Sequence, residues 1–217
     1  MKAKTAKKLI GDTILTTLNM LSQKGQLPVI VFSFGKQRCE ELALAASKDT
    51  RLGALLSESQ RRNVDELFDA ALLDLAEEDR KLTQIQQARA LLRRGLAVHH
   101  SGLLPFVKEI TEIIFQENLV RAIFVTETFA MGLNLPARCV VFSELRKFDG
   151  HDQRYVQSGE FIQMAGRAGR RGLDTQGIVI SVFTDADDCA KAVEIMQGSA
   201  EPLNSAYRLG YGSIINL

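Results

Sequence analysis

Ten residues, 163–172, hold the densest group of chemically active side chains in the sequence. They read QMAGRAGRRG, with Arg167 and Arg170 each preceded by a glycine. A guanidinium is permanently charged, and its planar set of donors matches the oxygens of a phosphate. The small residues between the arginines let the backbone approach a bulky polyanion. Residues three apart share a face of a helical turn, so we expect Arg167 and Arg170 to point the same way, with Gln163 beside them.

The composition limits what this basic segment can mean. The formal net charge is only +1, so any basic surface must be local, and a solvated basic turn is the plain alternative. A length of 217 residues fits one α/β domain with a single core. Three widely spaced cysteines, without a CxxC pair, fit a reducing compartment and exclude a cysteine-based zinc site. There is no signal peptide and no apolar run of membrane-spanning length, so no membrane partner is predicted.

Short apolar, β-branched runs alternate with helical patterns along the chain. This alternation predicts an α/β fold with a parallel sheet flanked by helices. The expected strands are 29–34, 97–99, 121–125, 140–142 and 178–183. Between the first two lies a charged stretch, 47–94, with apolar residues at helical spacing, which predicts a helical insertion of two or three helices, with Ser57 or Ser59 as a cap. A partner surface or a solvated helical layer would both fit it.

Three expected strands end in turns of small or hydroxyl residues. Gly35 follows the first, Ser101-Gly102 the second and Thr126 the third. Ligands of open α/β sheets bind at the carboxyl ends of the strands, and turns with free amides can hold phosphate. Read alone, the segment from Thr126 to Pro136 favours an N-capping threonine and an ordinary C-capping Gly-Leu-Asn over a ligand site.

Two further features, a pair of histidines and an Asp-Gly turn, could have a functional role. Adjacent histidines at 99 and 100 point to opposite faces of a strand, so we expect no metal site there. Asp149-Gly150 is a strong signal for a two-residue β-hairpin turn, with residues 146–148 and 153–156 as the strands that would pair on either side. A surface loop without a special role is the alternative.

Taken together, these motifs resemble a known enzyme family. QMAGRAGRRGLD is similar to the sixth motif, QxxGRxGR, of superfamily-two nucleic-acid helicases, and TETFAMGLN is similar to the fifth. HHSGLLP, RKFDG, SGEF and the ending PLNSAY resemble the DExH-box RNA helicases of the exosome-associated superkiller-type group, most closely its nuclear branch. The resemblance covers nearly all of the chain and implies a RecA-like domain, the second of the two that clasp ATP in such enzymes.

The resemblance also implies a role for each motif. Gln163, Arg167 and Arg170 would act on the ATP phosphates as catalytic residues, and the nucleotide-binding positions would be Gly132, Asn134, Gly166 and Gly169. RNA phosphates would meet Gly35, Ser101, Gly102 and Thr126. Relatives tend to have a hydroxyl where this chain has Gly35, so only the amide contact is expected there. The hairpin residues Phe148, Asp149, Gly150 and Tyr155 would separate strands at a duplex junction.

Some expected parts are absent from the sequence. There is no GxxxxGK[ST] loop and no DExH tetrapeptide, which the family places in the first RecA-like domain together with the magnesium of Mg-ATP. We therefore expect residues 1–217 to form the second RecA-like domain, with 203–217 beginning a further, truncated region. The predicted function is the second motor domain of an ATP-dependent 3′-to-5′ RNA helicase, inactive alone.

Partners and location follow from the same resemblance. The expected partners are RNA, the first RecA-like domain, and the RNA exosome with its adaptors, and the expected location is the nucleus, with the cytoplasm as the alternative. A stand-alone RNA-binding or regulatory domain, or the motor half of a DNA helicase, remain the alternative functions.

Overall fold

A five-stranded parallel sheet forms the centre of the molecule. The computed structural model describes residues 2–132, 135–183 and 186–198. The strands, in the spatial order β2-β3-β1-β4-β7, are β2 (Leu96–His99), β3 (Ala122–Val125), β1 (Val29–Phe32), β4 (Cys139–Phe142) and β7 (Ile178–Ser181). Every residue of β1 to β4 is buried, which explains their uninterrupted apolar sequences. The predicted α/β, RecA-like fold is confirmed.

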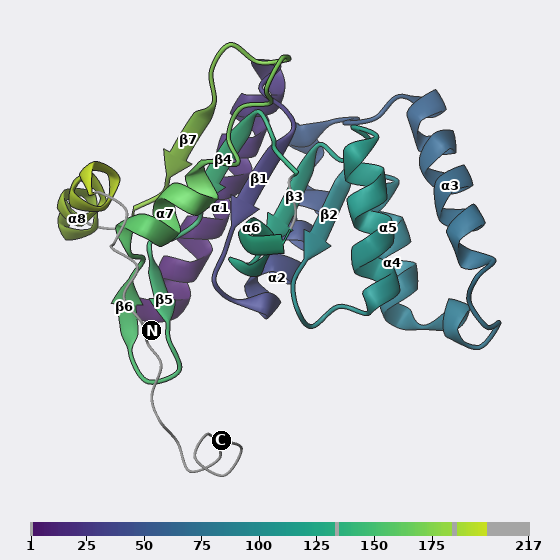
Figure 1. Ribbon diagram of the computed structural model, residues 1–217, viewed down its shortest axis with the longest axis horizontal. Coiled ribbons are helices and arrows are strands. Elements are labelled where there is room, and N and C mark those ends of the chain that lie inside the picture. The colour runs from purple at the N-terminus through teal and green to yellow at the C-terminus, as the bar shows by residue number, and fades with distance from the viewer. Residues whose placement is uncertain (1, 133–134, 184–185, 199–217) are drawn as a thin grey trace, which may run out of the picture.

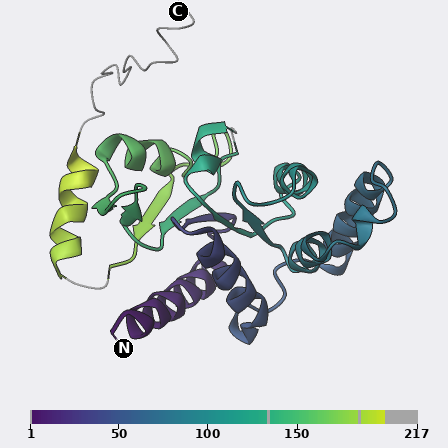
Figure 2. The ribbon, with the colours of Figure 1, turned by 90° about the horizontal axis from the view of Figure 1, so that it is seen from below.

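Helices cover both faces of this sheet. Figure 2 shows α1 (Lys2–Gln23) and α2 (Lys36–Lys48) on one face. On the other face lie α5 (Pro105–Gln116), α6 (Thr128–Gly132) and α7 (Ser158–Ala165), while α8 (Ala186–Gln197) stands beyond β7. The core therefore consists of two apolar layers with the sheet between them.

The segment predicted as a helical insertion forms two α-helices. These are α3 (Glu58–Leu72) and α4 (Thr83–Leu92), accompanied by 3₁₀ turns at Thr50–Leu52 and Asp79–Lys81. Ser57 caps α3 in a capping box with Gln60, which confirms the predicted cap. Val64, Phe68 and Ile85 are fully buried, so this layer is packed into the main core. Phe68 meets Phe106 of α5 edge to face, with ring centroids 6.0 Å apart.

The predicted hairpin exists, but its turn differs from the prediction. Strands β5 (Arg146–Phe148) and β6 (Gln153–Tyr155) pair antiparallel, with Phe148 opposite Gln153. Residues 149–152 therefore form a four-residue loop, and the two-residue turn at Asp149-Gly150 was wrong. The Asp149 carboxylate accepts from the amides of His151 and Asp152, both at 2.9 Å, and so stabilises the longer loop.

The parallel sheet gives the molecule two chemically different ends. In Figure 1 the hairpin lies below the carboxyl ends of the strands, whereas the loop between α7 and β7 lies at the opposite, amino end. That loop is fixed to the start of β4, because Gly169 N–H donates to the Ala137 carbonyl at 2.7 Å and Ala137 N–H donates to the Arg167 carbonyl at 2.9 Å. The sixth-motif segment and the strand-end turns are thus held at separate places by one rigid sheet.

Candidate functional site

A pocket of about 170 Å³ lies at the carboxyl end of the sheet. We call it the strand-end pocket. Its lining comes from the turns after β1 and β3, the turn after β2, and the first hairpin strand: Phe34, Lys36, Ser101, Thr126, Glu127, Thr128, Lys147 and Phe148. The sequence-predicted residues Ser101, Thr126 and Phe148 therefore meet in one place, with the Gly35 turn beside them. Hydroxyls and a lysine in one small hollow suit a phosphate group.

The Ser101-Gly102 turn is built on His100. The Gly102 amide donates to His100 Nδ1 at 3.1 Å, and His100 Nε2 lies 3.1 Å from the Glu40 carboxylate. An acceptor at Nδ1 places the proton on Nε2, where it is donated to Glu40. The amide of Gly102 is therefore engaged inside the protein, whereas the exposed Ser101 lines the strand-end pocket.

At the carboxyl end of the sheet, Thr126 is buried after β3, whereas Gly35 lies at the start of α2. Thr126 is 8% exposed, and its hydroxyl lies 3.1 Å from that of Thr128 in the first turn of α6. Gly35 is the N-cap residue of α2, where no side chain caps the helix. A Cβ added at Gly35 would meet only ordinary contacts, so the space there would accept the hydroxyl residue expected from the resemblance.

The four hairpin residues have unlike surroundings. Phe148 is 61% exposed next to the loop, as a side chain that contacts nucleic-acid bases must be. Asp149 and Gly150 shape the loop, with Gly150 at φ 105°. Tyr155 lies at the hairpin base, where its hydroxyl donates to Asp188 of α8 at 2.7 Å and accepts from Arg146 at 2.6 Å. Phe148 is consequently the better candidate for contact with a duplex, and Tyr155 holds the hairpin.

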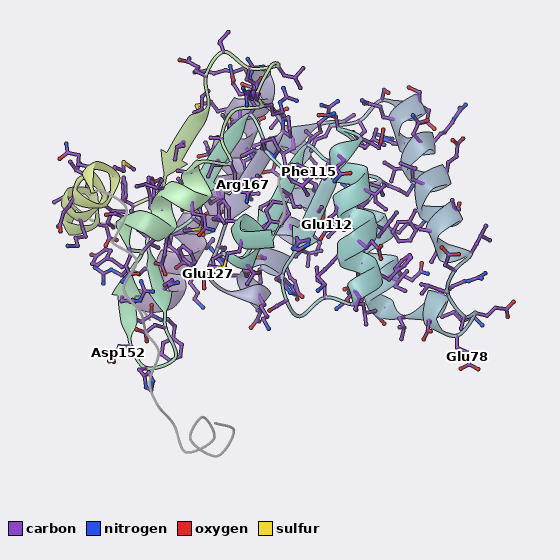
Figure 3. All side chains as sticks on the ribbon, in the orientation of Figure 1. Glu78, Glu112, Phe115, Glu127, Asp152 and Arg167 are labelled. Atoms are coloured by element: carbon purple, nitrogen blue, oxygen red, sulfur yellow. The ribbon has the colours of Figure 1, made fainter. Side chains whose placement is uncertain are left out.

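Arg167 lies between α7 and α6, as Figure 3 shows. Its guanidinium donates a hydrogen bond to the carbonyl of Ala130, so the sixth-motif segment is tied to the helix that starts beside Thr126. Gln163 is exposed on α7 and has no side-chain hydrogen bond to any residue that the structure describes. Because α7 ends at Ala165, Arg167 and Arg170 follow the helix, and the expected shared helical face was wrong.

Arg170 is held by a carboxylate that the sequence reading missed. Its Nε and Nη2 bind Asp174 Oδ2 and Oδ1 at 2.8 and 3.0 Å, and its Nη1 lies 3.3 Å from Asn118 Oδ1. The hydrogen bond from Arg170 lowers the pKa of Asp174 to about 2. In this conformation the Arg170 guanidinium is therefore bound within the domain. The spacing of four residues between Arg170 and Asp174 was the available signal.

The glycines of the sixth motif stabilise the local backbone and allow its close packing. The amide of Gly166 donates to the Ile162 carbonyl at 2.8 Å, and that of Gly169 is bonded to Ala137. Gly169 has φ 91°, and a Cβ there would lie 3.1 Å from the Gly177 backbone, so only glycine fits comfortably. Gly132 is exposed at the end of α6, while the predicted nucleotide contact Asn134 lies outside the described residues.

An ion-pair cluster beneath the hairpin was also missed. Lys147 Nζ lies 2.5 Å from Glu127 Oε2 and 2.7 Å from Glu160 Oε1. Arg154 donates to Glu160 through its two terminal nitrogens, Nη1 and Nη2, at 3.0 and 2.8 Å. Burial raises the pKa of Glu160, but hydrogen bonds from Arg154 and Lys147 outweigh it and lower that pKa to about 2. No local pattern in the sequence joins these residues.

The paired histidines are bound separately. His99 Nε2 lies 2.6 Å from Glu112 of α5, on the opposite side of β2 from the contact of His100 with Glu40. Within residues 2–132, 135–183 and 186–198, no three or more His, Cys, Asp or Glu residues gather as a metal site. Over the same ranges no helix is long and apolar enough to cross a membrane.

Comparison with known proteins shows similarity along most of the chain. The chain is 45% identical over 206 residues to the exosome RNA helicase MTR4 of Homo sapiens, a match that covers 95% of this chain and 19% of that protein. It is 48% identical over 204 residues to the ATP-dependent RNA helicase mtr4 of Schizosaccharomyces pombe, covering 94% and 18%. The antiviral helicase SKI2 of Saccharomyces cerevisiae is 45% identical over 202 residues, covering 92% and 15%.

No protein-family model matches the chain. The similarities nevertheless confirm the resemblance to DExH-box RNA helicases of the superkiller type, of which this chain corresponds to a segment of less than one fifth.

Proposed function

We propose that this chain, a homologue of the MTR4- and SKI2-type DExH-box RNA helicases, is the second RecA-like motor domain of an ATP-dependent 3′-to-5′ RNA helicase. Its role would be to unwind RNA for processing or degradation by the exosome. One observation supports this most: the strand-end pocket gathers Ser101, Thr126 and Phe148, while the sixth-motif arginines lie elsewhere along the same sheet. A motor domain needs separate surfaces for RNA and for nucleotide, and this separation supports the proposal.

At the RNA surface, contact is proposed through phosphates. Ser101 and Thr126 offer hydroxyls, Gly35 its amide and Lys36 a charge, and none of these groups reads a base edge. Phe148 extends beyond the pocket, where it can meet a base that leaves the duplex. This division suits a motor that follows RNA irrespective of sequence.

At the nucleotide surface, the guanidiniums of Arg167 and Arg170 are proposed to bind the γ-phosphate. Gln163 and Gly132 are proposed to contribute to the same surface, as is Asn134, which lies outside the described residues. Arg170 must first leave Asp174, so the phosphate and the carboxylate compete for one guanidinium. Charge increases on the equatorial phosphate oxygens during transfer, and a guanidinium placed there stabilises it. Asp174 would then hold Arg170 in a resting position until ATP arrives.

ATP with Mg²⁺ is the proposed cofactor. When bound, it supplies the phosphoryl group whose transfer to water drives movement. The arginine donors suit phosphate oxygens. By the layout that the resemblance implies, we assign the magnesium to the first RecA-like domain of the complete polypeptide. The other proposed partners are RNA, the exosome and its adaptors, in the nucleus or, alternatively, the cytoplasm.

One observation favours a second candidate. The Arg170–Asp174 ion pair is also what a stand-alone RNA-binding or regulatory domain without catalysis would show, because such a domain has no phosphate to bind. The motor half of a DNA helicase is a further alternative, which the RKFDG and SGLLP matches disfavour.

The deciding experiment measures ATP hydrolysis by the complete polypeptide, with and without single-stranded RNA and DNA. A helicase motor should show RNA-stimulated turnover, and the isolated 217-residue chain should show none. A complete polypeptide that binds RNA without ATP turnover supports the regulatory domain. Equal stimulation by DNA would support the DNA motor instead.

A further inference from the structure

Lys147 is a buried cation at the centre of the site. It is 8% exposed, whereas both neighbours on its strand, Arg146 and Phe148, face solvent. Burying an ammonium is costly unless it is paired and hydrogen-bonded, and Lys147 has two carboxylate partners, Glu127 and Glu160. Burial lowers the pKa of Lys147, but these hydrogen bonds outweigh it and raise that pKa, so the side chain is charged.

The two carboxylates belong to different functional parts. Glu127 follows Thr126 directly and lines the strand-end pocket, and Figure 3 shows it near the hairpin. Glu160 lies in the first turn of α7, where it also accepts from the Gln157 amide at 2.9 Å. Lys147 therefore joins the turn after β3, the hairpin and the helix that leads into the sixth motif.

The hairpin adds a second cation to the same carboxylate. Arg154 lies directly opposite Lys147 in the β5–β6 ladder, and both bind Glu160. If the cluster served only to fix the hairpin to α7, the contacts of Lys147 and Arg154 with Glu160 would be enough. Lys147 Nζ also lies 2.5 Å from Glu127, and this further contact connects the cluster to the strand-end pocket. Any shift of the Thr126-Glu127 turn must move a carboxylate bound to Lys147.

We propose that Lys147 is a positioning residue that couples RNA in the strand-end pocket to the placement of α7 and of the arginines that follow this helix. RNA phosphate beside Thr126 shifts the Glu127 carboxylate, Lys147 follows, and Glu160 transmits the change to α7. RNA thereby promotes the arginine placement needed for ATP hydrolysis. The inference rests on the proposed motor function. The bond between Arg167 and Ala130 provides a parallel connection through α6, so Lys147 carries a share of the coupling.

The test compares variants of the complete polypeptide by the ratio of RNA-saturated to RNA-free ATP turnover. Lys147→Met keeps the length of the side chain and removes its charge. We expect the ratio to fall roughly 3- to 30-fold, the range typical of residues that modulate coupling between sites. Lys147→Arg should recover much of it. Lys36→Met removes a charge from the same pocket without touching either carboxylate, so its main effect should be a higher RNA concentration for half-saturation.

Folding is checked by thermal melting of each variant. If Lys147→Met fails to fold, Glu127→Gln decides, because it weakens the pocket side of the cluster and leaves Lys147 bound to Glu160. In the double variant the losses should not add, since both changes break one contact. An unchanged ratio in a folded Lys147→Met or Glu127→Gln protein overturns the inference while the motor function stands. Absence of RNA stimulation in the wild-type polypeptide would sink the proposed function itself.

Discussion

Arg170 and Asp174 form a bidentate ion pair whose carboxylate is almost completely buried, with only 3% of its side chain exposed. Arg138 contributes a further, more distant charge, with its Nε 3.6 Å from Asp174 Oδ1. The guanidinium that the motif assigns to phosphate is thus also part of the folded domain. A substitution at Arg170 has consequences for stability that an arginine in an open cleft would not have.

The first prediction concerns stability against pH. The folded-state pKa of Asp174 lies near 2, below its ordinary value of 3.8, so its contribution to stability is complete above the ordinary pKa and is lost as pH falls toward 2. Arg170→Ala should therefore lower the unfolding free energy at pH 7 and make it less sensitive to pH between about 5 and 2. Urea unfolding of the isolated chain at several pH values measures both effects.

Arg171→Ala is the matched control for this experiment. Arg171 is exposed, and its side chain has no hydrogen bond or ion pair with the residues that the structure describes, so its variant should keep the wild-type pH slope. Identical slopes for Arg170→Ala and the wild type would mean that the ion pair does not stabilise the fold in solution.

The second prediction concerns RNA affinity. Binding to the isolated chain should be modest, and the logarithm of the binding constant should fall linearly with the logarithm of salt concentration, because phosphates supply the contacts. Thr126→Val preserves the side-chain shape and removes the hydroxyl, so the affinity should fall about 10-fold, as for loss of one hydrogen bond to a charged group. Fluorescence anisotropy at matched salt gives these values. Much tighter binding of one RNA than of its scrambled versions would rule out phosphate tracking.

The third prediction separates strand separation from ATP turnover. Replacing loop residues 149–152 with a two-residue Asn-Gly turn shortens the hairpin tip and keeps Lys147 and Arg154 at its base. Duplex unwinding by the complete polypeptide should fall several-fold, whereas RNA-stimulated ATP hydrolysis should largely survive. A deletion across 148–155 would be less informative, since it also removes Arg154 from Glu160.

Phe148→Ala tests whether a single side chain of the hairpin separates the strands. Phe148 is mostly exposed, so its loss should change stability by no more than about 0.5 kcal/mol, as is usual for surface positions. Reduced unwinding with intact turnover would assign the strand-separating role to this side chain. Parallel loss of unwinding and turnover would indicate that the hairpin only supports the fold.

The sheet was predictable because its strands are uninterrupted apolar runs. The turns at Ser101 and Thr126 were predictable for a related reason: they follow such runs, and parallel strands bring their carboxyl ends together. The hairpin loop was misjudged, because Asp149-Gly150 signals a tight turn, whereas the Asp149 side chain accepts two amides further along and stabilises a four-residue loop. Two local signals competed there, the Asp-Gly pair and the hydrogen bonds of the Asp149 side chain, and the side-chain contact prevailed.

The ion pairs could be read from the sequence only in part. Lys147 is 20 residues from Glu127 and 13 from Glu160, and only the folded sheet brings them together. Arg170 and Asp174 are four apart, so their pairing was within reach of sequence reasoning. Sequence motifs indicate which residues can act, and the fold determines which partners they have before the ligand arrives.

The last prediction tests the arginine assignment itself. In the complete polypeptide, Arg170→Ala should cut RNA-stimulated turnover by roughly 10³–10⁵, the effect of removing an arginine that stabilises phosphoryl transfer in other enzymes. RNA binding without nucleotide should change little, because the Arg170 segment is fixed to the amino end of the sheet. Arg170→Lys keeps the charge but loses the planar donors, so it should remain slow. Arg171→Ala should turn over normally, as its side chain faces solvent. Because the ion pair with Asp174 also stabilises the fold, each variant is assayed well below its melting temperature. If Arg171→Ala lost RNA-stimulated turnover and Arg170→Ala kept it, the motif would be aligned one residue out of register.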